Sequence, residues 1–389
     1  MAKIDDSVKK KVPELRFKGF TDDWEERKFA DFIDVKSGKD YKHLNSGPIP
    51  VYGTGGYMLS VDRALSDIDA IGIGRKGTID KPYLLKAPFW TVDTLFYAVP
   101  KQNIDLQFSL SIFKKINWKK FDESTGVPSL SKTVINSVGA SVPCYEEQQK
   151  IGSFFKQLDK TIALHQRKLD LLKEQKKGYL QKMFPKNGAK VPELRFAGFA
   201  DDWEERKLGN LSQDTIGGGT PKTSVTEYWN GEIPWIQSSD LANDKLYGVL
   251  PKKFITEDAV KNSATKLIPA NSIAIVTRVG VGKLAFMPYE FASSQDFLSL
   301  SNLQVDCNFG MYSIYKMLQR ELNNIQGTSI KGITKADLLD KETFVPIKVE
   351  EQQKIGSFFK QLDDIIDLHQ RRLDLLKEQK KGFLQKMFI

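Results

Sequence analysis

The chain has 389 residues, and its 58 Lys and Arg against 49 Asp and Glu give a formal net charge of +9. This length allows two domains of ordinary size. Its two cysteines, Cys144 and Cys307, form no CxxC pair, which argues against a disulfide framework. No apolar run reaches the roughly 18 residues of a membrane span, and no signal-peptide pattern opens the chain. We therefore expect a soluble two-domain protein of the cytoplasm.

The first predicted element is a short repeat at residues 11–29, KVPELRFKGFTDDWEERKF. It returns at residues 190–208 with 16 of 19 identities. We expect its Trp24 and Trp203 to be core or docking positions, together with the apolar residues Leu15, Phe17 and Phe20. A tandem repeat of this kind determines the architecture before any local motif is considered.

A variable block follows each short repeat, at residues 30–143 and 209–346. Both blocks are predicted to be compact α/β domains, with β-rich runs at 70–73, 89–99, 272–278 and 291–300 between Gly and Pro. The pair at 49–50 matches 233–234, and at a displacement of 203 Arg75 aligns with Arg278 and Asp93 with Asp296. The pattern indicates one fold that carries two different surfaces.

A long helix closes each half. Residues 146–185 return at 350–389 with 34 of 40 identities, so the chain is a tandem duplication. The order gives six segments: short-repeat segments 1–29 and 186–208, variable blocks 30–143 and 209–346, and long helices 144–185 and 347–389. Spacings of four and three predict a heptad seam in each helix, formed by Ile151, Phe155, Leu158, Ile162, His165, Leu169, Leu172, Lys176, Tyr179 and Met183, and by Ile355, Phe359, Leu362, Ile366, His369, Leu373, Leu376, Lys380, Phe383 and Met387.

The polar seam members predict how the helices pair. A parallel pair would place Lys176 against Lys380, whereas an antiparallel pair places Lys176 opposite Leu362 and Lys380 opposite Leu158. We therefore expect an antiparallel coiled coil with the lysine stems reaching out to solvent. It would relate the variable domains by an approximate two-fold axis and hold them at opposite ends of a rod. Glycines at 152 and 178 should each weaken a helix end by about 1 kcal/mol.

Two features leave alternatives open. His165 and His369 could form a metal site or a pH switch, but with three histidines in the chain and no accompanying Cys or carboxylate cluster, a structural role that fixes register is favoured. The repeated helices carry nine basic against five acidic residues, and eight against seven. This excess could serve nucleic-acid binding or could merely solvate the helix faces.

The motifs that suggest catalysis are incomplete. Residues 72–77 match GxGxxG, but Pro82 follows where a Rossmann helix would run, so a strand, a turn and a second strand are expected. Residues 217–223, GGGTPKT, have Pro221 where a P-loop needs glycine. The sequence lacks an NPPY-like methyltransferase signature, a nuclease arrangement and zinc-ligand spacing. We expect a chain without catalytic activity.

The ordered combination of short repeats containing VPELRF, blocks containing SGKDYKHLNSGPIPVYGTGG and GGGTPKTSVTEYWNGEIPWIQSSDL, and helices that begin EEQQKI resembles the specificity subunit of type I restriction-modification systems. The resemblance covers essentially the whole chain. It implies an α+β (α/β) class with two tandem target-recognition domains, each of which reads one half of a bipartite, asymmetric DNA target. It also implies that the helices set the spacer.

The resemblance further implies the partners. The helices would dock two modification (methyltransferase) subunits, which methylate adenine with S-adenosylmethionine. Restriction subunits with ATP and Mg²⁺ would perform translocation and cleavage in the full complex. This chain itself would hold no cofactor and no metal.

Base reading requires side chains that present paired donors and acceptors near the turns. The candidates for DNA contact are Lys39, Tyr41, Lys42, Thr54, Arg75, Lys76, Thr94 and Lys132 in the first block, and Thr220, Lys222, Gln237, Ser238, Arg278, Lys283, Ser294, Gln295 and Lys335 in the second. Lys132 and Lys335 are expected at phosphates. Arg75 and Arg278 could instead form internal ion pairs with Asp93 and Asp296, or do neither.

Two rival functions remain at this stage. A scaffold that binds two copies of a partner protein without reading DNA would explain the repeats, although it leaves the divergence of the blocks unexplained. An autonomous enzyme is the third possibility, and the missing catalytic residues argue against it.

Overall fold

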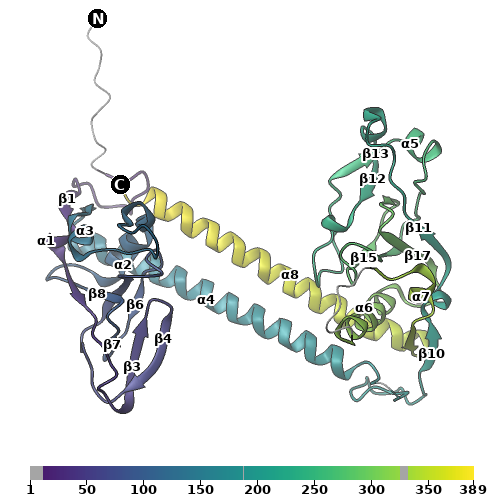
Figure 1. The fold of residues 1–389 in the computed structure, drawn as a ribbon, viewed down its shortest axis with the longest axis horizontal. Coiled ribbons are helices and arrows are strands. Elements are labelled where there is room, and N and C mark those ends of the chain that lie inside the picture. The colour runs from purple at the N-terminus through teal and green to yellow at the C-terminus, as the bar shows by residue number, and fades with distance from the viewer. Residues whose placement is uncertain (1–11, 187, 325–331) are drawn as a thin grey trace, which may run out of the picture. The chain divides into compact units, whose positions relative to one another are not determined.

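The computed structural model describes residues 12–186, 188–324 and 332–389, and the chain divides into two compact units (Figure 1). Unit 1 is Met1–Lys168 with Gln370–Ile389, and unit 2 is Leu169–His369. The start of the first short repeat, up to residue 11, lies outside the described residues. Each unit contains part of both long helices, so the units do not coincide with the six consecutive segments predicted from the sequence. The segment boundaries therefore stay a prediction.

Unit 1 contains the first short repeat and the first variable block. Its elements are β1 (Glu25–Lys28), α1 (Phe29–Phe32), β2 (Ile33–Ser37), β3 (Ser46–Gly53), β4 (Gly56–Val61), β5 (Ala70–Gly74), β6 (Tyr83–Leu85), β7 (Trp90–Thr91), β8 (Leu95–Pro100), α2 (Leu106–Lys115), a 3-10 turn (Trp118–Phe121), α3 (Lys132–Ser137), β9 (Gly139–Val142) and the start of α4 (Tyr145–Lys182).

Unit 2 repeats the order of the strands and has α5 as an additional helix. Its elements are β10 (Glu204–Lys207), a 3-10 turn (Leu208–Leu211), β11 (Ser212–Gly217), a 3-10 turn (Thr226–Trp229), β12 (Ile233–Ile236), a 3-10 turn (Ser238–Asp240), β13 (Lys253–Ile255), α5 (Glu257–Lys261), β14 (Ser272–Val276), β15 (Leu284–Met287), β16 (Ala292–Ser293), β17 (Phe297–Leu303), α6 (Cys307–Asn324), α7 (Lys335–Leu339), β18 (Glu342–Val345) and the start of α8 (Val349–Lys386).

The two variable blocks have the same sheet topology. In unit 1 a four-stranded antiparallel sheet has the order β2-β8-β5-β6, and a three-stranded sheet has the order β4-β3-β7 with β3 and β7 parallel. In unit 2 the corresponding orders are β11-β17-β14-β15 and β13-β12-β16. The predicted class of two mixed helix-and-strand domains in tandem is therefore confirmed, and divergent sequences encode one fold.

Each short repeat belongs to the fold of the block that follows it. Its EERK segment forms β1, which pairs antiparallel with β9 at the end of the first block, and β10 pairs with β18 in the same way. The indoles of Trp24 and Trp203 are buried. Because the first and last strands of each block pair, the block begins and ends beside its long helix.

Each domain buries one indole whose N–H bonds to an equivalent carbonyl. Trp90 in β7 donates from Nε1 to the carbonyl oxygen of Lys39 at 2.9 Å, and Trp235 in β12 donates to that of Gly219 at 3.1 Å. A buried indole N–H needs such an acceptor. The same internal hydrogen bond is therefore made from two different strands.

Each of these indoles lies opposite a smaller side chain on the neighbouring strand. Val51 is the cross-strand partner of Trp90, and Ala292 is the partner of Trp235. The large and the small side chain have exchanged strands between the two domains. Volume and hydrogen bonding are thus preserved although neither position keeps its residue.

The long helices run antiparallel within each unit. In unit 1 Asp159 of α4 pairs with Lys380 of α8 at 2.5 Å, and the ring of Phe154 lies 5.0 Å from that of Phe383. The residue numbers of α4 therefore rise in the direction in which those of α8 fall. In unit 2 the ion pair of Lys176 with Asp363, at 2.5 Å, and the ring contact of Tyr179 with Phe358, at 5.1 Å, show the same direction. Every predicted seam residue is buried or half-buried.

The expected position of the seam lysines is wrong. Lys176 does not extend its ammonium group into solvent, because the residue is 8% exposed and its Nζ pairs with Asp363. Lys380 pairs likewise with Asp159. A buried ammonium group requires a carboxylate, and each long helix supplies one beside its seam leucine.

The two glycines of each long helix have different roles. An added Cβ at Gly178 would meet nothing within 4 Å, whereas a Cβ at Gly356 would lie 2.6 Å from a carboxylate oxygen of Asp306 and 2.6 Å from the backbone nitrogen of Phe309. Gly152 makes the same close approach to α2 in unit 1. The expectation that glycine merely weakens the helix is therefore wrong at Gly152 and its copy Gly356, which let α2 and α6 approach the long helix.

We predict opposite effects for alanine at these two glycines of unit 2. Gly356→Ala should destabilise the fold by about 2 kcal/mol, because the methyl group overpacks the start of α6. Gly178→Ala should stabilise it by about 1 kcal/mol through helix propensity. Differential scanning calorimetry of the two variants checks this, and equal shifts of Tm would contradict the close approach.

Candidate nucleic-acid interface

Loops that follow the central strands meet at one edge of unit 1. The N–H of Arg75, after β5, donates to the carbonyl oxygen of Thr94, before β8, at 2.8 Å, and the N–H of Lys76 donates to the same oxygen at 3.2 Å. The N–H of Lys39, after β2, bonds to Thr91 at 2.9 Å. The turn at Thr54 also approaches, since its hydroxyl is 3.6 Å from where a Cβ of the glycine after Lys76 would lie. This loop edge brings together five of the predicted residues.

Unit 2 has the equivalent loop edge. The hydroxyl of Thr220 donates to the side-chain oxygen of Gln295, which joins the loop after β11 to the loop before β17. The N–H of Ser294 bonds to Ile236 at 2.9 Å, beside Gln237 at the end of β12. The structure therefore brings Thr220, Gln237 and Gln295 to one edge.

The strand register shows that the sequence alignment of the two blocks is wrong by one residue in this region. Gly74 pairs with Leu95 in unit 1, and Val276 pairs with Phe297 in unit 2, so both strands are displaced by 202 positions instead of 203. By register, Arg75 corresponds to Thr277. The backbone agrees, because the N–H of Thr277 bonds to the carbonyl of Asp296 at 2.7 Å just as that of Arg75 bonds to Thr94. The supposed shared arginine is therefore not shared.

The alternative internal ion pairs of Arg75 and Arg278 are not formed. The guanidinium of Arg75 bonds to the backbone carbonyl of Asp93 at 3.4 Å and lies over the ring of Phe96 at 5.8 Å. In the described part of the chain Arg278 has no ion pair, and its side chain is exposed. Both guanidinium groups thus remain accessible at the loop edges.

Four candidates for DNA contact have structural roles that make their side chains less available to DNA. Nζ of Lys283 donates to the carbonyl of Leu241 at 2.9 Å, so it holds a loop. Ser294 is 4% exposed. Tyr41 is half-buried against the core of the smaller sheet. Ser238 lies in a 3-10 turn, where its carbonyl accepts from Lys283 at 3.4 Å.

The remaining basic candidates lie on exposed loops and helix starts. Lys132 and Lys335 are the first residues of α3 and α7, directly after the capping residues Ser131 and Thr334. This explains the recurring Ser/Thr-Lys pair as a helix cap followed by an exposed lysine. Lys42 and Lys222 are also exposed, on the loops after β2 and β11.

Each loop edge also contains exposed residues that were not among the predicted candidates. In unit 1 the hairpin tip exposes Tyr57 and Met58, at 64% and 50%, beside the Thr54 turn. In unit 2 Val279 is 71% exposed. The sequence suggests Asp93 only as an arginine partner, but by strand register it occupies the position of Gln295 and is exposed. The register is the signal that identifies it.

In each unit the short repeat is attached to the start of a long helix by an ion pair. Arg16 of the first short repeat donates two hydrogen bonds of 2.8 Å to the buried carboxylate of Glu147 at the start of α4. Arg195 does the same with Glu351 at the start of α8, at 2.7 and 2.8 Å. Such a paired geometry is the strongest form of this interaction.

The next residue of each long helix holds the variable block. The side chain of Gln148 accepts from the N–H of Asp105 at 3.0 Å and donates to the carbonyl of Pro143 at 2.9 Å. Gln352 repeats both bonds with Asp306, at 2.9 Å, and Pro346, at 2.8 Å. Asp105 and Asp306 also cap α2 and α6. One glutamine in each unit thus fixes the start of α2 or α6.

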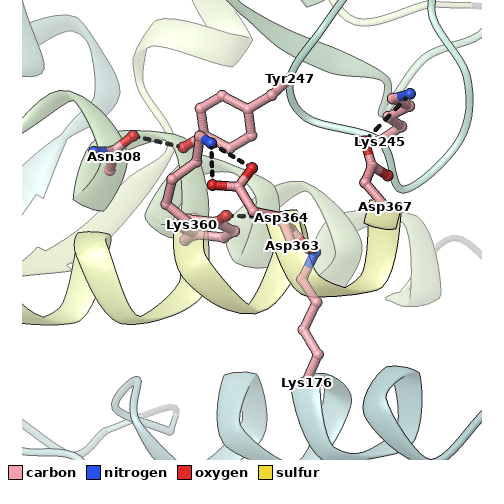
Figure 2. Close-up of polar contacts among 9 residues, drawn as sticks. Lys176, Lys245, Tyr247, Asn308, Lys360, Asp363, Asp364 and Asp367 are labelled. Carbon is pink, nitrogen blue, oxygen red and sulfur yellow. Dashed lines mark hydrogen bonds and ion pairs between the residues drawn. The ribbon is translucent and has the colours of Figure 1, made fainter. Parts of the chain in front are cut away.

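In unit 2 a set of polar contacts ties α6 to the long helices (Figure 2). Asp363 of α8 receives the ammonium of Lys176 at 2.5 Å and the hydroxyl of Tyr312 at 2.7 Å. Lys360 lies over the ring of Tyr247 at 4.9 Å. Because Tyr312 is buried in α6, these bonds link the second variable block to both copied helices.

In unit 1 the equivalent carboxylate has a different third partner. Asp159 receives Lys380 at 2.5 Å and Lys114 of α2 at 2.7 Å. Burial raises the pKa of Asp159, but the hydrogen bonds from the two lysines outweigh it and hold the pKa below its usual value of 3.8. The copied helices thus supply one Lys–Asp pair per unit, and each variable block completes it with its own residue.

Metal binding and membrane insertion find no support in the described ranges. Within them, no group of three or more His, Cys, Asp or Glu residues could hold a metal ion. No helix in those ranges is long and apolar enough to cross a membrane. His165 and His369 are half-buried in the seam.

Comparison with known proteins identifies the family. The model of the type I restriction modification DNA specificity domain matches residues 21–174 and 200–378. The chain therefore belongs to this family, with one domain of the family in each half.

Individual relatives match parts of the chain. The type I restriction enzyme MjaIX specificity subunit of Methanocaldococcus jannaschii is 30% identical over 192 residues, which are 48% of this chain and 44% of that protein. The EcoR124I/EcoR124II specificity subunit of Escherichia coli is 32% identical over 173 residues, 42% of this chain and 41% of that protein. The chain spans less than half the length of these two relatives in each match.

Solved structures share the fold. The S subunit of the type I restriction-modification system from M. genitalium has a TM-score of 0.71 at 14% identity and covers 97% of this chain and 99% of that chain. A chain from a structure of the assembly and conformational transition of the type I R-M system has a TM-score of 0.52 at 16% identity, with 94% and 97% covered.

We predict that the buried pair in unit 2 is worth far more than an exposed pair beside it. Asp363→Asn should destabilise the fold by about 3 kcal/mol, because it leaves the buried ammonium of Lys176 without its carboxylate. Asp367→Asn should cost less than about 1 kcal/mol, since the 3.4 Å pair with Lys245 is half exposed. Urea unfolding of both variants measures the difference, and equal costs would refute the role of Asp363.

The lowered pKa of Asp159 predicts a pH dependence. A carboxyl group whose pKa is lower in the folded state stabilises the fold above its unfolded pKa, and this contribution disappears as pH falls through the folded value. Thermal stability should therefore fall below about pH 4, less so in Asp159→Asn. Calorimetry from pH 7 to 3 tests this, with Asp34→Asn, at an exposed pair, as the control. An unchanged pH profile in Asp159→Asn would contradict it.

Proposed function

We propose that this chain is the DNA-reading, non-catalytic subunit of a type I restriction-modification complex, and that each loop edge reads one half of a bipartite target. The observation that supports this most is the contrast between copied and divergent parts. Arg16–Glu147 and Arg195–Glu351 are the same contact in two copies. The loop edges differ at equivalent positions, since Gln295 lies where unit 1 has Asp93 and Thr277 lies where unit 1 has Arg75. Identical supports with different edges suit a protein that reads two dissimilar half-sites.

The chemistry of the edges suits base reading. An amide such as that of Gln295 can pair with adenine, and a carboxylate such as that of Asp93 can accept from cytosine. Arg75 and Arg278 can reach guanine or phosphate. The exposed apolar residues Tyr57 and Val279 can contact thymine methyl groups. Each edge thus combines the groups that distinguish base pairs in the major groove.

The copied surface suits two identical partners. Leu164 of α4 is 55% exposed and its copy Leu368 is 59% exposed, while Leu171 and its copy Leu375 are 52% and 58% exposed. Each unit therefore presents one leucine from each long helix. Equal apolar surface on both units would dock two methyltransferase subunits, and through them the restriction subunits.

Catalysis in this proposal belongs to the partners. The methyltransferase subunits would bring S-adenosylmethionine and methylate adenine, and the restriction subunits would use ATP and Mg²⁺. The complex would act in the cytoplasm, on double-stranded DNA. The role of this chain is to bind and position the DNA for the enzymes that it carries.

The function can be tested by co-expressing the chain with its methyltransferase subunit in a host that lacks adenine methylation. Long-read sequencing then maps N6-methyladenine across the genome. Methylation at one interrupted, asymmetric motif is the expected result. A stable complex with two methyltransferase copies but without any motif would support a scaffold that does not read DNA.

The two loop edges should be separable by mutation. Gln295→Ala should relax recognition in the second half-site alone, by about tenfold or more in the preference for the correct base, because one paired contact is lost. Asp93→Ala, at the equivalent register position, should affect only the first half-site. Methylation mapping of both variants checks this. A change in both half-sites from either variant would contradict independent edges.

A further inference from the structure

A basic cavity in unit 2 has no role in the function proposed so far. It has a volume of about 440 Å³ and lies between the end of α4, the second short repeat, α6 and β18. The charged residues of its lining are Lys182, Lys186, Glu193, Lys316 and Arg320. Four cations thus face one carboxylate, and that carboxylate is already paired with Lys186. The cavity therefore has excess positive charge.

Lys316 of α6 lies in the lining of this cavity. Its side chain is half-buried in α6, and no carboxylate of the described residues forms an ion pair with it. Burial lowers its pKa, and the neighbouring charge of Arg320, one helical turn away, lowers it further. Arg320 already has partners of its own, because its Nε lies 3.9 Å from Glu321 and its Nη2 donates to the carbonyl oxygen of Glu342 at 3.3 Å. Two like charges on the wall of a cavity favour an anion between them.

The other unit supplies an internal comparison. Lys115 stands ten residues after the capping Asp105, as Lys316 stands ten residues after Asp306. Nζ of Lys115 donates to the carbonyl oxygen of Ile389 at 2.5 Å. The equivalent lysine is therefore satisfied within unit 1, whereas Lys316 faces the cavity.

The lining favours a peptide over DNA. The apolar side chains of Phe184, Met317 and Phe344 lie beside the cations. A duplex backbone would present phosphates and sugars, whereas a peptide with an acidic residue next to a large apolar one matches both the cations and the apolar side chains. None of the loops that form the loop edge of unit 2 lines the cavity.

We propose that this cavity binds an acidic segment of the methyltransferase subunit that docks on unit 2, with a carboxylate at Lys316 and Arg320 and an adjacent apolar side chain against Phe344. The inference rests on the proposed function and adds to it that the two methyltransferase copies are held unequally. The copy on unit 1 would lack this contact, because Lys115 is already bonded there.

The test uses the full chain with the methyltransferase subunit, titrated by native mass spectrometry. In Lys316→Gln we expect one of the two copies to bind about tenfold more weakly, because a buried charge pair is lost. Lys316→Arg should retain both copies, and the matched control Lys115→Gln should bind both as the unaltered chain does. Circular dichroism melting confirms that each variant is folded.

A carbodiimide cross-link identifies the occupant, since it joins a lysine amine directly to a carboxylate. In the assembled complex, peptide mapping should find Lys316 linked to an Asp or Glu of the methyltransferase subunit. Unchanged binding of both copies by Lys316→Gln would overturn the inference and leave the proposed function intact. Weakened DNA binding with unchanged assembly would also overturn it, in favour of a phosphate contact. If the unaltered chain binds no methyltransferase subunit, both proposals are wrong.

Discussion

Each long helix begins with a buried carboxylate that an arginine of the short repeat holds in place. Glu147 and Glu351 are 0% and 1% exposed, and each receives two hydrogen bonds from its arginine, Arg16 or Arg195, as a buried carboxylate requires. The first short repeat also contacts the end of the opposite helix, because the N–H of Leu15 bonds to the carbonyl of Lys386 at 2.9 Å. A few residues of the short repeat therefore hold the beginning of one long helix beside the end of the other.

This junction separates what must be constant from what can vary. The copied segments supply the arginine, the carboxylate, the glutamine and the glycine of the contact. From the variable block they require a helix that starts at a capping aspartate, Asp105 or Asp306, and whose first turn can approach the glycine closely. The loops at the far ends of the strands make none of these contacts. Their sequences are therefore free to change without affecting how the domain is held.

Much of this architecture follows from the sequence, and the exceptions have physical causes. The repeats and the heptad spacing predict the two long helices, and avoiding contact between Lys176 and Lys380 predicts their antiparallel direction. The partner of Lys176 could not be predicted from the seam alone, since Asp363 lies just outside it. The equivalence of Arg75 and Arg278 is wrong because identical letters align at a displacement of 203, whereas the paired strands are displaced by 202. The correct displacement follows only from the strand pairing, which cannot be read from the sequence.

The exchanged indoles have a consequence for how recognition domains can be shuffled. Trp90 and Trp235 reach equivalent carbonyls from different strands, each opposite a smaller side chain. A genetic crossover inside a block could join β3 of one domain to β16 of the other, leaving a cavity and an unsatisfied carbonyl, or could place two indoles where one fits. Such hybrids would be lost at folding, whereas whole blocks exchanged at the short repeats and long helices would keep matched cores. If the blocks read DNA as proposed, the core of each domain makes the block the smallest heritable unit of that specificity.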